Sequence, residues 1–272
     1  MDLFLYYFKS FLLGSVQGFS EFIPISSTAH LLMGVEFLGL ELDDFMKSFV
    51  IIIQLASILA VIYLYWNKIF SNFLIYFKKV SVAFIPTAII GLAVYSFVRS
   101  FLQESFLVMS IALFVGGILI IILENFYKKR NNLNNEKSLD LSDYLSEISY
   151  RKCFYIGVFQ VIAVIPGVSR SAATIFGGLS LGLSRRAIVE FSFLLAIPTM
   201  AAASGLDLIR SGASFDSGQF IFLSIGFLFS FLVALFSIKF LINFIKRNNF
   251  KPFGWYRIFI GLFLLIYIVF IK

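Results

Sequence analysis

The chain has 272 residues, of which 60% are hydrophobic, 18% aromatic and only 14% charged, and its net charge is +7. Charged residues make up about a quarter of an ordinary soluble domain, so this composition excludes a soluble enzyme and indicates a polytopic membrane protein. The positive net charge is better explained by membrane topology than by nucleic-acid binding, which nothing but the charge supports.

The first forty residues form an apolar region that is broken near its middle. Residues 1–39 are interrupted by Pro24, and hydroxyl residues follow at Ser26, Ser27 and Thr28. Irregular backbone at membrane depth survives only where it is buried in protein or lines a wet cavity, so we expect a re-entrant helix–loop–helix element. Because no basic region precedes the apolar run, a removable signal peptide is not expected.

Six later stretches are apolar over about twenty residues, the length that crosses a hydrocarbon core of about 30 Å. A second broken region, residues 152–183, is interrupted at Pro166 and Gly167. The sequence therefore predicts an all-α polytopic membrane protein with six transmembrane helices and two re-entrant elements. The six expected spans are residues 48–66, 81–98, 105–123, 188–206, 219–238 and 255–271.

Residues 125–151 form the one extended hydrophilic linker and divide the chain into two halves of like design. Each half, 1–124 and 152–272, holds one broken element followed by three spans. Because three is odd, the second half must enter the membrane upside down relative to the first, which makes an inverted-topology repeat. The tips of the two broken elements can then meet inside the bilayer, within a single integral membrane domain.

The distribution of Lys and Arg predicts the orientation, because short cytoplasmic loops are enriched in these residues. If the chain starts outside, sixteen of them lie on the cytoplasmic side and five lie outside, with Arg170 left in the second broken element. The cytoplasmic set includes Arg257, which we assign to the loop after the fifth span. We therefore expect both termini to face outward and the linker 125–151 to be cytoplasmic.

The polar residues of the first broken element are spaced for a shared site. Glu21 follows Gln17 by four positions, so both side chains project from one helical face. A carboxylate there can hold a divalent cation or accept a proton. His30, the only histidine, follows Ser27 by three positions, where an imidazole can deprotonate the hydroxyl or attack phosphorus itself. The hydroxyl cluster is also suited to capping a helix.

Arg170 lies in the second broken element, where an arginine at the membrane centre costs roughly 2.5–3.5 kcal/mol on insertion scales. We therefore expect its side chain to face an interior cavity and to bind an anion. Gly167 permits close backbone approach, and a helix that begins near Ser169 adds free amides. The hydroxyls of Ser171 and Thr174 complete a cradle suited to phosphate.

Two structural alternatives stay open for these charges. Arg170 could pair with Glu21 or Glu190 only to hold the two halves together. Glu21 could equally be a helix-end carboxylate at the membrane interface.

The two motifs together resemble the signature regions of a known family. The pattern GxxQGxxEFxPxSSTAHL at residues 14–31 and PGVSRSAAT at 166–174 are similar to those of the undecaprenyl-pyrophosphate phosphatases of the bacitracin-resistance type, and the likeness continues through residues 189–200. The resemblance implies hydrolysis of undecaprenyl pyrophosphate to undecaprenyl phosphate, with a divalent cation, Mg²⁺ or Ca²⁺. The resemblance also implies that this activity lies on the outer side of the bacterial cytoplasmic membrane. The product is the lipid carrier for peptidoglycan, and removal of the pyrophosphate form lowers sensitivity to bacitracin.

The resemblance also implies roles for individual positions. Glu21 matches the family's essential glutamate, Ser27 and His30 its proposed catalytic pair, and Arg170 its phosphate-binding arginine. Gln17 stands where many members have glutamate, which makes it the weaker metal ligand beside Glu21. The residues expected around the substrate phosphates are Ser26, Thr28, Gly167, Ser169, Ser171 and Thr174.

We expect the diphosphate head to enter from the outer face while the polyprenyl tail stays between the spans. Arg170 and a cation near Glu21 would neutralise the phosphoryl charge, and the nucleophile is either Ser27 activated by His30 or His30 itself. A polyprenyl-phosphate flippase or a secondary transporter built on the same repeat remains an alternative. The expected partners are the lipid substrate and the bilayer, and the sequence is compatible with a monomer or a homodimer.

Overall fold

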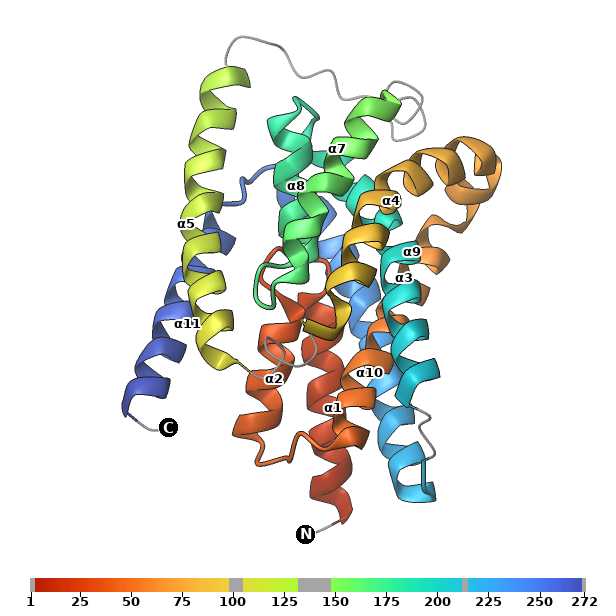
Figure 1. The fold of residues 1–272 in the computed structure, drawn as a ribbon, viewed down its shortest axis with the longest axis vertical. Helices are drawn as coiled ribbons and strands as arrows, with labels where there is room; N and C mark the ends of the chain where they lie inside the picture. The colour runs from red at the N-terminus through yellow and green to blue at the C-terminus, as the bar shows by residue number, and fades with distance from the viewer. Residues whose placement is uncertain (1–2, 98–104, 132–147, 212–214, 271–272) are drawn as a thin grey trace.

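The computed structural model of the protein describes residues 3–97, 105–131, 148–211 and 215–270. Within these ranges all regular structure is helical, and Figure 1 shows the helices standing roughly side by side. Both termini lie at one end of the molecule, whereas α5 ends and α7 begins at the other end. The all-α prediction is therefore confirmed for the described part of the chain.

The first half of the chain opens with two short helices, and its three later helices are long. The five helices are α1 (Leu3–Ser20), α2 (Ser27–Phe37), α3 (Asp44–Ser71), α4 (Phe73–Phe97) and α5 (Phe106–Asn131). The second half follows the same order, with a short 3₁₀ turn after its first helix. Its elements are α7 (Tyr150–Val161), η2 (Ile162–Val164), α8 (Arg170–Ser180), α9 (Arg185–Ser211), α10 (Ser217–Ile245) and α11 (Lys251–Phe270).

Each of the six predicted spans lies, apart from a residue or two at its ends, within one of six described helices that are long and apolar enough to cross a membrane. These helices extend beyond the predicted bounds by several residues at most ends. The reason is that polar residues outside the hydrocarbon continue or cap a helix: the Asp43 carboxylate accepts a hydrogen bond from the Met46 amide at 2.7 Å, for example. Residues 98 and 271, at two predicted span ends, lie outside the described residues.

Helices extend into the predicted hydrophilic linker 125–151 from both sides. Helix α5 continues to Asn131 and α7 begins at Tyr150, capped by the Ser149 hydroxyl, which accepts from the Lys152 amide at 3.4 Å. Hydropathy marks where the chain leaves the apolar region, whereas a helix can continue into water as long as its backbone bonds are kept. Residues 132–147 of the predicted linker lie outside the described part of the chain.

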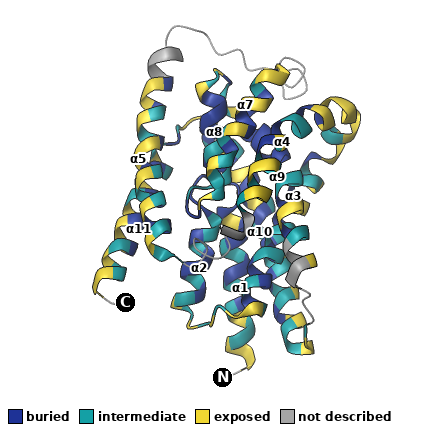
Figure 2. Ribbon diagram, viewed as in Figure 1, coloured by how far each residue is buried: buried dark blue, intermediate teal, exposed yellow. Residues whose placement is uncertain are grey.

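Among the six membrane-length helices, α3 and α9 are more buried than the other four, and Figure 2 shows exposed residues along α5 and α11. In the most apolar 18-residue stretch of each helix, 61% and 67% of α3 and α9 is buried inside the protein, compared with 22–33% of α4, α5, α10 and α11. The other four helices expose large apolar side chains such as Ile89 and Phe259. A protein in water does not leave so many apolar side chains exposed, so these helices face lipid, as expected for a multi-pass membrane protein.

The first helix of each half packs closely on a helix of the other half. Helix α1 lies along α10, and a Cβ at Gly14 would collide with the backbone of Gly226. Helix α7 lies along α4, and a Cβ at Gly157 would collide with the Ala83 carbonyl. Small residues at these crossings let the helix backbones approach, which is the usual basis of packing inside membranes.

Both predicted helix breaks are confirmed, and they end in the same unusual backbone. Ser26 precedes α2 with φ of 74°, and Ser169 precedes α8 with φ of 75°. A residue with a Cβ adopts this left-handed region at an energetic cost and is found there mostly at functional sites. The Ser169 hydroxyl caps α8 by accepting from the Ala172 amide at 3.3 Å, whereas the Ser26 side chain makes no capping bond.

Candidate active site

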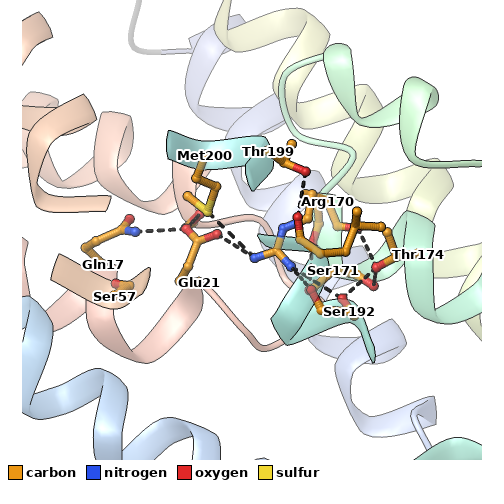
Figure 3. Close-up of polar contacts among 12 residues, drawn as sticks. Gln17, Glu21, Ser57, Arg170, Ser171, Thr174, Ser192, Thr199 and Met200 are labelled. Atoms are coloured by element: carbon orange, nitrogen blue, oxygen red, sulfur yellow. Dashed lines mark hydrogen bonds and ion pairs between the residues drawn. The ribbon is translucent and has the colours of Figure 1, made fainter. Parts of the chain in front are cut away.

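An ion pair joins the two helix breaks. Nη2 of Arg170, at the start of α8, lies 3.0 Å from Oε1 of Glu21, in the turn after α1 (Figure 3). Only 4% of the Glu21 side chain and 12% of the Arg170 side chain are exposed. The predicted meeting of the two tips is therefore observed, although these residues are 149 positions apart in the sequence.

The other carboxylate oxygen of Glu21 accepts two hydrogen bonds. Nε2 of Gln17 donates to Oε2 at 2.8 Å from the last turn of α1, and the Ser27 hydroxyl donates to the same oxygen at 2.7 Å. The Ser27 hydroxyl proton thus points at the Glu21 carboxylate, and the lone pairs of Ser27 Oγ point elsewhere. A hydroxyl held by a neighbouring base in this way is arranged for nucleophilic attack.

Arg170 is held in place by α9. Its Nη1 donates to the carbonyl of Ser192 at 2.8 Å and to the Ser192 hydroxyl at 3.3 Å, and its Nη2 lies 3.8 Å from Sδ of Met200. The Arg170 Nε is buried and has no hydrogen-bond partner among the described residues. One donor of this guanidinium is therefore left for a ligand. Sequence reasoning assigned no role to Ser192 or Met200, although both lie in the stretch 189–200 that extends the family resemblance.

The hydroxyls near Arg170 divide into two groups. Ser169 lines the cavity described below, and its hydroxyl lies 3.2 Å from that of Ser171. Ser171 and Thr174 are buried and do not line the cavity; the Thr174 hydroxyl contacts the Ser192 hydroxyl at 2.6 Å. Because neither side chain lines the cavity and the Thr174 hydroxyl contacts α9, substrate binding by Ser171 and Thr174 stays a prediction.

His30 bonds the backbone of Ser26 and the side chain of Tyr256. Its Nδ1 lies 2.7 Å from the Ser26 carbonyl, and its Nε2 lies 2.8 Å from the hydroxyl of Tyr256 on α11, whose ring stacks on the imidazole. A carbonyl can only accept, so Nδ1 carries the proton and Nε2 accepts from the tyrosine. The Ser27 hydroxyl is bound to Glu21 instead, and a catalytic role for His30, as base or as nucleophile, stays a prediction.

A cavity of about 780 Å³ opens beside the ion pair. Its polar end contains Glu21, Ser27 and Arg170, and its walls are largely apolar. The predicted residues Ser26, Thr28, Gly167 and Ser169 also line it, whereas His30, Gln17, Ser171 and Thr174 do not. The remaining lining residues are Gln54, Phe84, Thr87, Ala88, Gly91, Leu92, Gln160, Ala163, Val164, Ile165, Pro166, Thr199, Met200, Ala201, Ala202, Ala203, Gly205, Leu206 and Ile209.

A second amide reaches the same cavity from α7. Nε2 of Gln160 donates to the hydroxyls of Thr87 and Thr199 at 2.8 and 3.2 Å. The two threonine hydroxyls donate their own hydrogen bonds to backbone carbonyls and do not donate to Gln160. Oε1 of Gln160 is therefore left without a hydrogen-bond partner in the described structure. The cavity therefore has an unsatisfied acceptor as well as the free donor of Arg170.

These features can be compared with known proteins. A family model described as Bacitracin resistance protein BacA matches residues 10–263. The chain belongs to this family. Proteins named undecaprenyl-diphosphatase from Aquifex aeolicus and Persephonella marina are 48% and 45% identical to it. These alignments cover 93% and 96% of this chain and 95% and 98% of the two relatives. A protein of the same name from Enterococcus faecalis is 41% identical over 95% of both chains.

This BacA-family chain also contains a buried arginine that sequence reasoning misplaced. Arg257 was assigned to a cytoplasmic loop, but it lies in the second turn of α11 with none of its surface exposed. Gly116 on α5 makes room for it, because a Cβ there would overlap the guanidinium. The loop assignment was wrong, and it also conflicted with the predicted span 255–271, which contains Arg257.

Arg257 binds the backbone of both tips. Its Nη1 donates to the carbonyls of Pro24 and Val168 at 3.2 and 2.9 Å, and its Nη2 donates to those of Gly167 and Ala112 at 2.9 and 3.0 Å. Nε lies 3.5 Å from a fifth carbonyl, on α5. The side chain thus fixes the first tip, the second tip and α5 relative to one another.

Glu190 belongs to a different cluster from Arg170. Its carboxylate lies 3.0 Å from Nε of Arg186 and 3.6 Å from Nζ of Lys68. Of the two acidic partners considered for Arg170, the structure pairs it with Glu21. The alternative contact with Glu190 is therefore wrong.

Proposed function

We propose that this BacA-family protein hydrolyses undecaprenyl diphosphate to undecaprenyl phosphate and inorganic phosphate. The observation that carries the proposal is the cavity in which Ser27, Glu21 and Arg170 meet beside apolar walls. A phosphorylated lipid is the ligand that matches a polar end and an apolar remainder. The name that the relatives carry agrees with this chemistry.

The reaction begins with attack of the Ser27 oxygen on the terminal phosphorus. The hydroxyl proton passes to Oε2 of Glu21, to which it is already hydrogen-bonded. The new bond joins the Ser27 oxygen to phosphorus, and the bond from that phosphorus to the bridging oxygen breaks, which releases undecaprenyl phosphate. Water then hydrolyses the phosphoserine, releases inorganic phosphate and restores the hydroxyl.

Arg170 stabilises the charge on the phosphoryl oxygens. Its Nε is free, and Nη2 can turn from Glu21 toward phosphate once the carboxylate has taken a proton. The amides at the start of α8 add a fixed positive potential beside it. His30 supports the turn at Ser26 and does not transfer the Ser27 proton in this scheme.

The residues beside Glu21 also fit the divalent cation, Mg²⁺ or Ca²⁺, that the family resemblance implies. Oε1 of Gln17 is a buried oxygen without a hydrogen-bond partner among the described residues, and it lies on the amide that contacts the Glu21 carboxylate. Such oxygens are the ligands that these hard cations prefer. The ion would supply positive charge to the diphosphate. No group of three or more His, Cys, Asp or Glu side chains suited to a metal occurs in the described ranges, so Gln17, Glu21 and substrate oxygens would hold it together.

The proposed setting is the bacterial cytoplasmic membrane, with both termini and the cavity on its outer side. The two termini share one end of the molecule, whereas Arg151, Lys152, Arg185 and Arg186 belong to helix starts at the other end (Figure 1). An excess of basic residues is typical of the cytoplasmic side. Hydrolysis there would regenerate the lipid carrier of cell-wall synthesis and lower sensitivity to bacitracin.

The inverted repeat and the two re-entrant elements are part of the same proposal. The pairing of α1 with α10 matches that of α7 with α4, as expected if the halves are related by a two-fold axis. The strained serines at 26 and 169 also occupy equivalent places before α2 and α8. The flippase or transporter considered from the sequence is not supported, since the relatives are named as diphosphatases.

The test is phosphate release from undecaprenyl diphosphate by the purified protein in detergent with Mg²⁺. Ser27→Ala should abolish turnover while the protein still inserts and purifies normally. Ser224→Ala is the matched control, because this exposed serine on α10 bonds only its own helix backbone among the described contacts. No phosphate release by the unaltered protein, or unchanged release by Ser27→Ala, would overturn the proposal.

A further inference from the structure

The side chain of Gln160 lies in the cavity wall and is held in one orientation. It is 1% exposed, and it lines the cavity together with Thr87 and Thr199. Both threonine hydroxyls donate to backbone carbonyls, at 3.2 and 2.7 Å, so toward Gln160 they can only accept. Nε2 of Gln160 therefore points to the two hydroxyls, and Oε1 is turned away from them. This oxygen is buried and has no hydrogen-bond partner among the described residues.

Gln160 has a counterpart in the first half of the chain, and the two amides have different surroundings. The Gly-x-x-Gln motif that ends at Gln160 also ends at Gln17. Nε2 of Gln17 donates to the Glu21 carboxylate, but the residue four positions after Gln160 is Val164. The described contacts of the Gln160 side chain are to hydroxyls, and a divalent cation prefers a site that includes carboxylates. The oxygen of Gln160 is thus suited to a neutral hydrogen-bond donor rather than to a metal.

Water is the donor that the proposed reaction brings to this oxygen. An amide oxygen only accepts hydrogen bonds, so it cannot bind an ionised phosphate, whose oxygens also only accept. Buried polar atoms are normally satisfied, often by an ordered water. The proposed reaction consumes one water, in the hydrolysis of the phosphoserine at Ser27. Ser27 and Gln160 line the same cavity.

A chain of contacts connects Gln160 to the arginine of the site. The Thr199 hydroxyl accepts from Gln160 at 3.2 Å. The next residue, Met200, places its Sδ 3.8 Å from Nη2 of Arg170. Figure 3 shows Thr199 and Met200 on one side of the Arg170 guanidinium and Ser192 on the other. Gln160 therefore belongs to the side of the site that faces the cavity, where the phosphoryl group is expected.

We propose that Oε1 of Gln160 positions the water that hydrolyses the phosphoserine. This inference rests on the proposed function and concerns its second step. The water donates one proton to the Gln160 oxygen in a hydrogen bond, so that a lone pair of the water oxygen can face phosphorus. A glutamine amide that orients an attacking water is known from GTP hydrolysis.

The second step transfers the phosphoryl group from Ser27 to water. The water oxygen forms a bond to phosphorus, and the bond from phosphorus to the Ser27 oxygen breaks. The proton that Glu21 took in the first step returns to the Ser27 oxygen. Both water protons leave with the product, one on the new oxygen and one on a phosphoryl oxygen, so dihydrogen phosphate is released. Gln160 neither gains nor loses a proton, because an amide is not a base.

The experiment follows the first turnover of the purified protein in detergent with Mg²⁺. Undecaprenyl diphosphate with a radioactive terminal phosphate is mixed with the protein, and the reaction is stopped in acid at short times. Each sample gives the amount of undecaprenyl phosphate and the amount of label bound covalently to Ser27.

Two substitutions test the amide, and a third is the matched control. Gln160→Met keeps a side chain of similar length without either amide group. Gln160→Asn keeps the amide but withdraws it by one methylene group. Gln219→Met is the control, because Gln219 caps α10 and does not line the cavity.

Gln160→Met should form one undecaprenyl phosphate per protein as fast as the unaltered protein does. It should then turn over about 10²-fold more slowly, because the attacking water is misplaced. Labelled phosphoserine should accumulate at Ser27 during this slow phase. Gln160→Asn should show the same pattern with a smaller loss, and Gln219→Met should match the unaltered protein.

A loss of kcat without accumulation of labelled protein would overturn the inference, because Gln160 would then act before or during the first step. Unchanged kcat in both Gln160 variants would overturn it as well. If Gln160→Met does not fold, the same measurements on Gln160→Asn decide. Failure of the unaltered protein to hydrolyse undecaprenyl diphosphate would instead overturn the proposed function, and the inference with it.

Discussion

Arg170 and Arg257 both lie inside the described structure, and their surroundings differ. Arg170 pairs with one carboxylate, borders a cavity and keeps its Nε unpaired. Arg257 has none of its surface exposed and is bound to five backbone carbonyls. An arginine within the membrane is therefore not by itself a sign of a binding site. The unpaired donor beside open space marks the residue that can act on a ligand.

Substitution of Arg170 should produce the largest change in this comparison. Arg170→Ala removes the charge that faces the phosphoryl group, and kcat should fall about 10²–10³-fold, as for loss of one preorganised donor to a transition state. Phosphate release from undecaprenyl diphosphate measures the effect. A fall smaller than about tenfold would mean that Arg170 only joins the two halves, as the purely structural alternative requires.

Substitution of Arg257 should act on stability first. Arg257→Met keeps an unbranched apolar stem but leaves several buried carbonyls without a donor, which should cost about 3–5 kcal/mol of the free energy of unfolding. Thermal unfolding in detergent measures this loss. The kcat of the folded fraction at low temperature should fall much less than in Arg170→Ala. An unchanged melting temperature would show that the five bonds contribute little.

Substitution of Tyr256 tests whether His30 has a structural or a catalytic role. Tyr256→Phe removes the donor to His30 Nε2 but keeps the stacked ring, so kcat should fall by less than about tenfold, in line with one hydrogen bond worth roughly 1 kcal/mol. Combined with His30→Ala, the tyrosine substitution should have no further effect, because its partner is gone. Additive losses in the double variant would contradict the assigned contact.

The smallest expected change concerns the metal. Gln17→Glu replaces the unpaired amide oxygen with a second carboxylate beside Glu21, which should tighten the apparent affinity for Mg²⁺ by about threefold to tenfold. Activity measured across a Mg²⁺ titration gives the half-saturating concentration. Gln17→Leu, which has no oxygen, should weaken that affinity. Equal half-saturation in all three proteins would exclude this position from the metal site.

Local sequence signals were sufficient to predict the helices and the two breaks. Apolar runs and Pro24 or Pro166 act on nearby backbone, and the charge of Arg170 in an apolar segment required a partner wherever the fold could supply one. The sequence could not predict that His30 bonds Tyr256, or that Arg257 reaches the carbonyls of both tips. Those contacts join residues 89 or more positions apart and depend on how the helices pack.

The place of Arg257 in the chain has a consequence for biogenesis. It belongs to α11, yet the described partners of its donors are backbone carbonyls of α5 and of the turns around positions 24 and 167. A ribosome-bound chain in which α11 has not yet been inserted leaves those carbonyls without their donor. Insertion of α11 therefore locks the reaction chamber, and the active enzyme cannot form before that step.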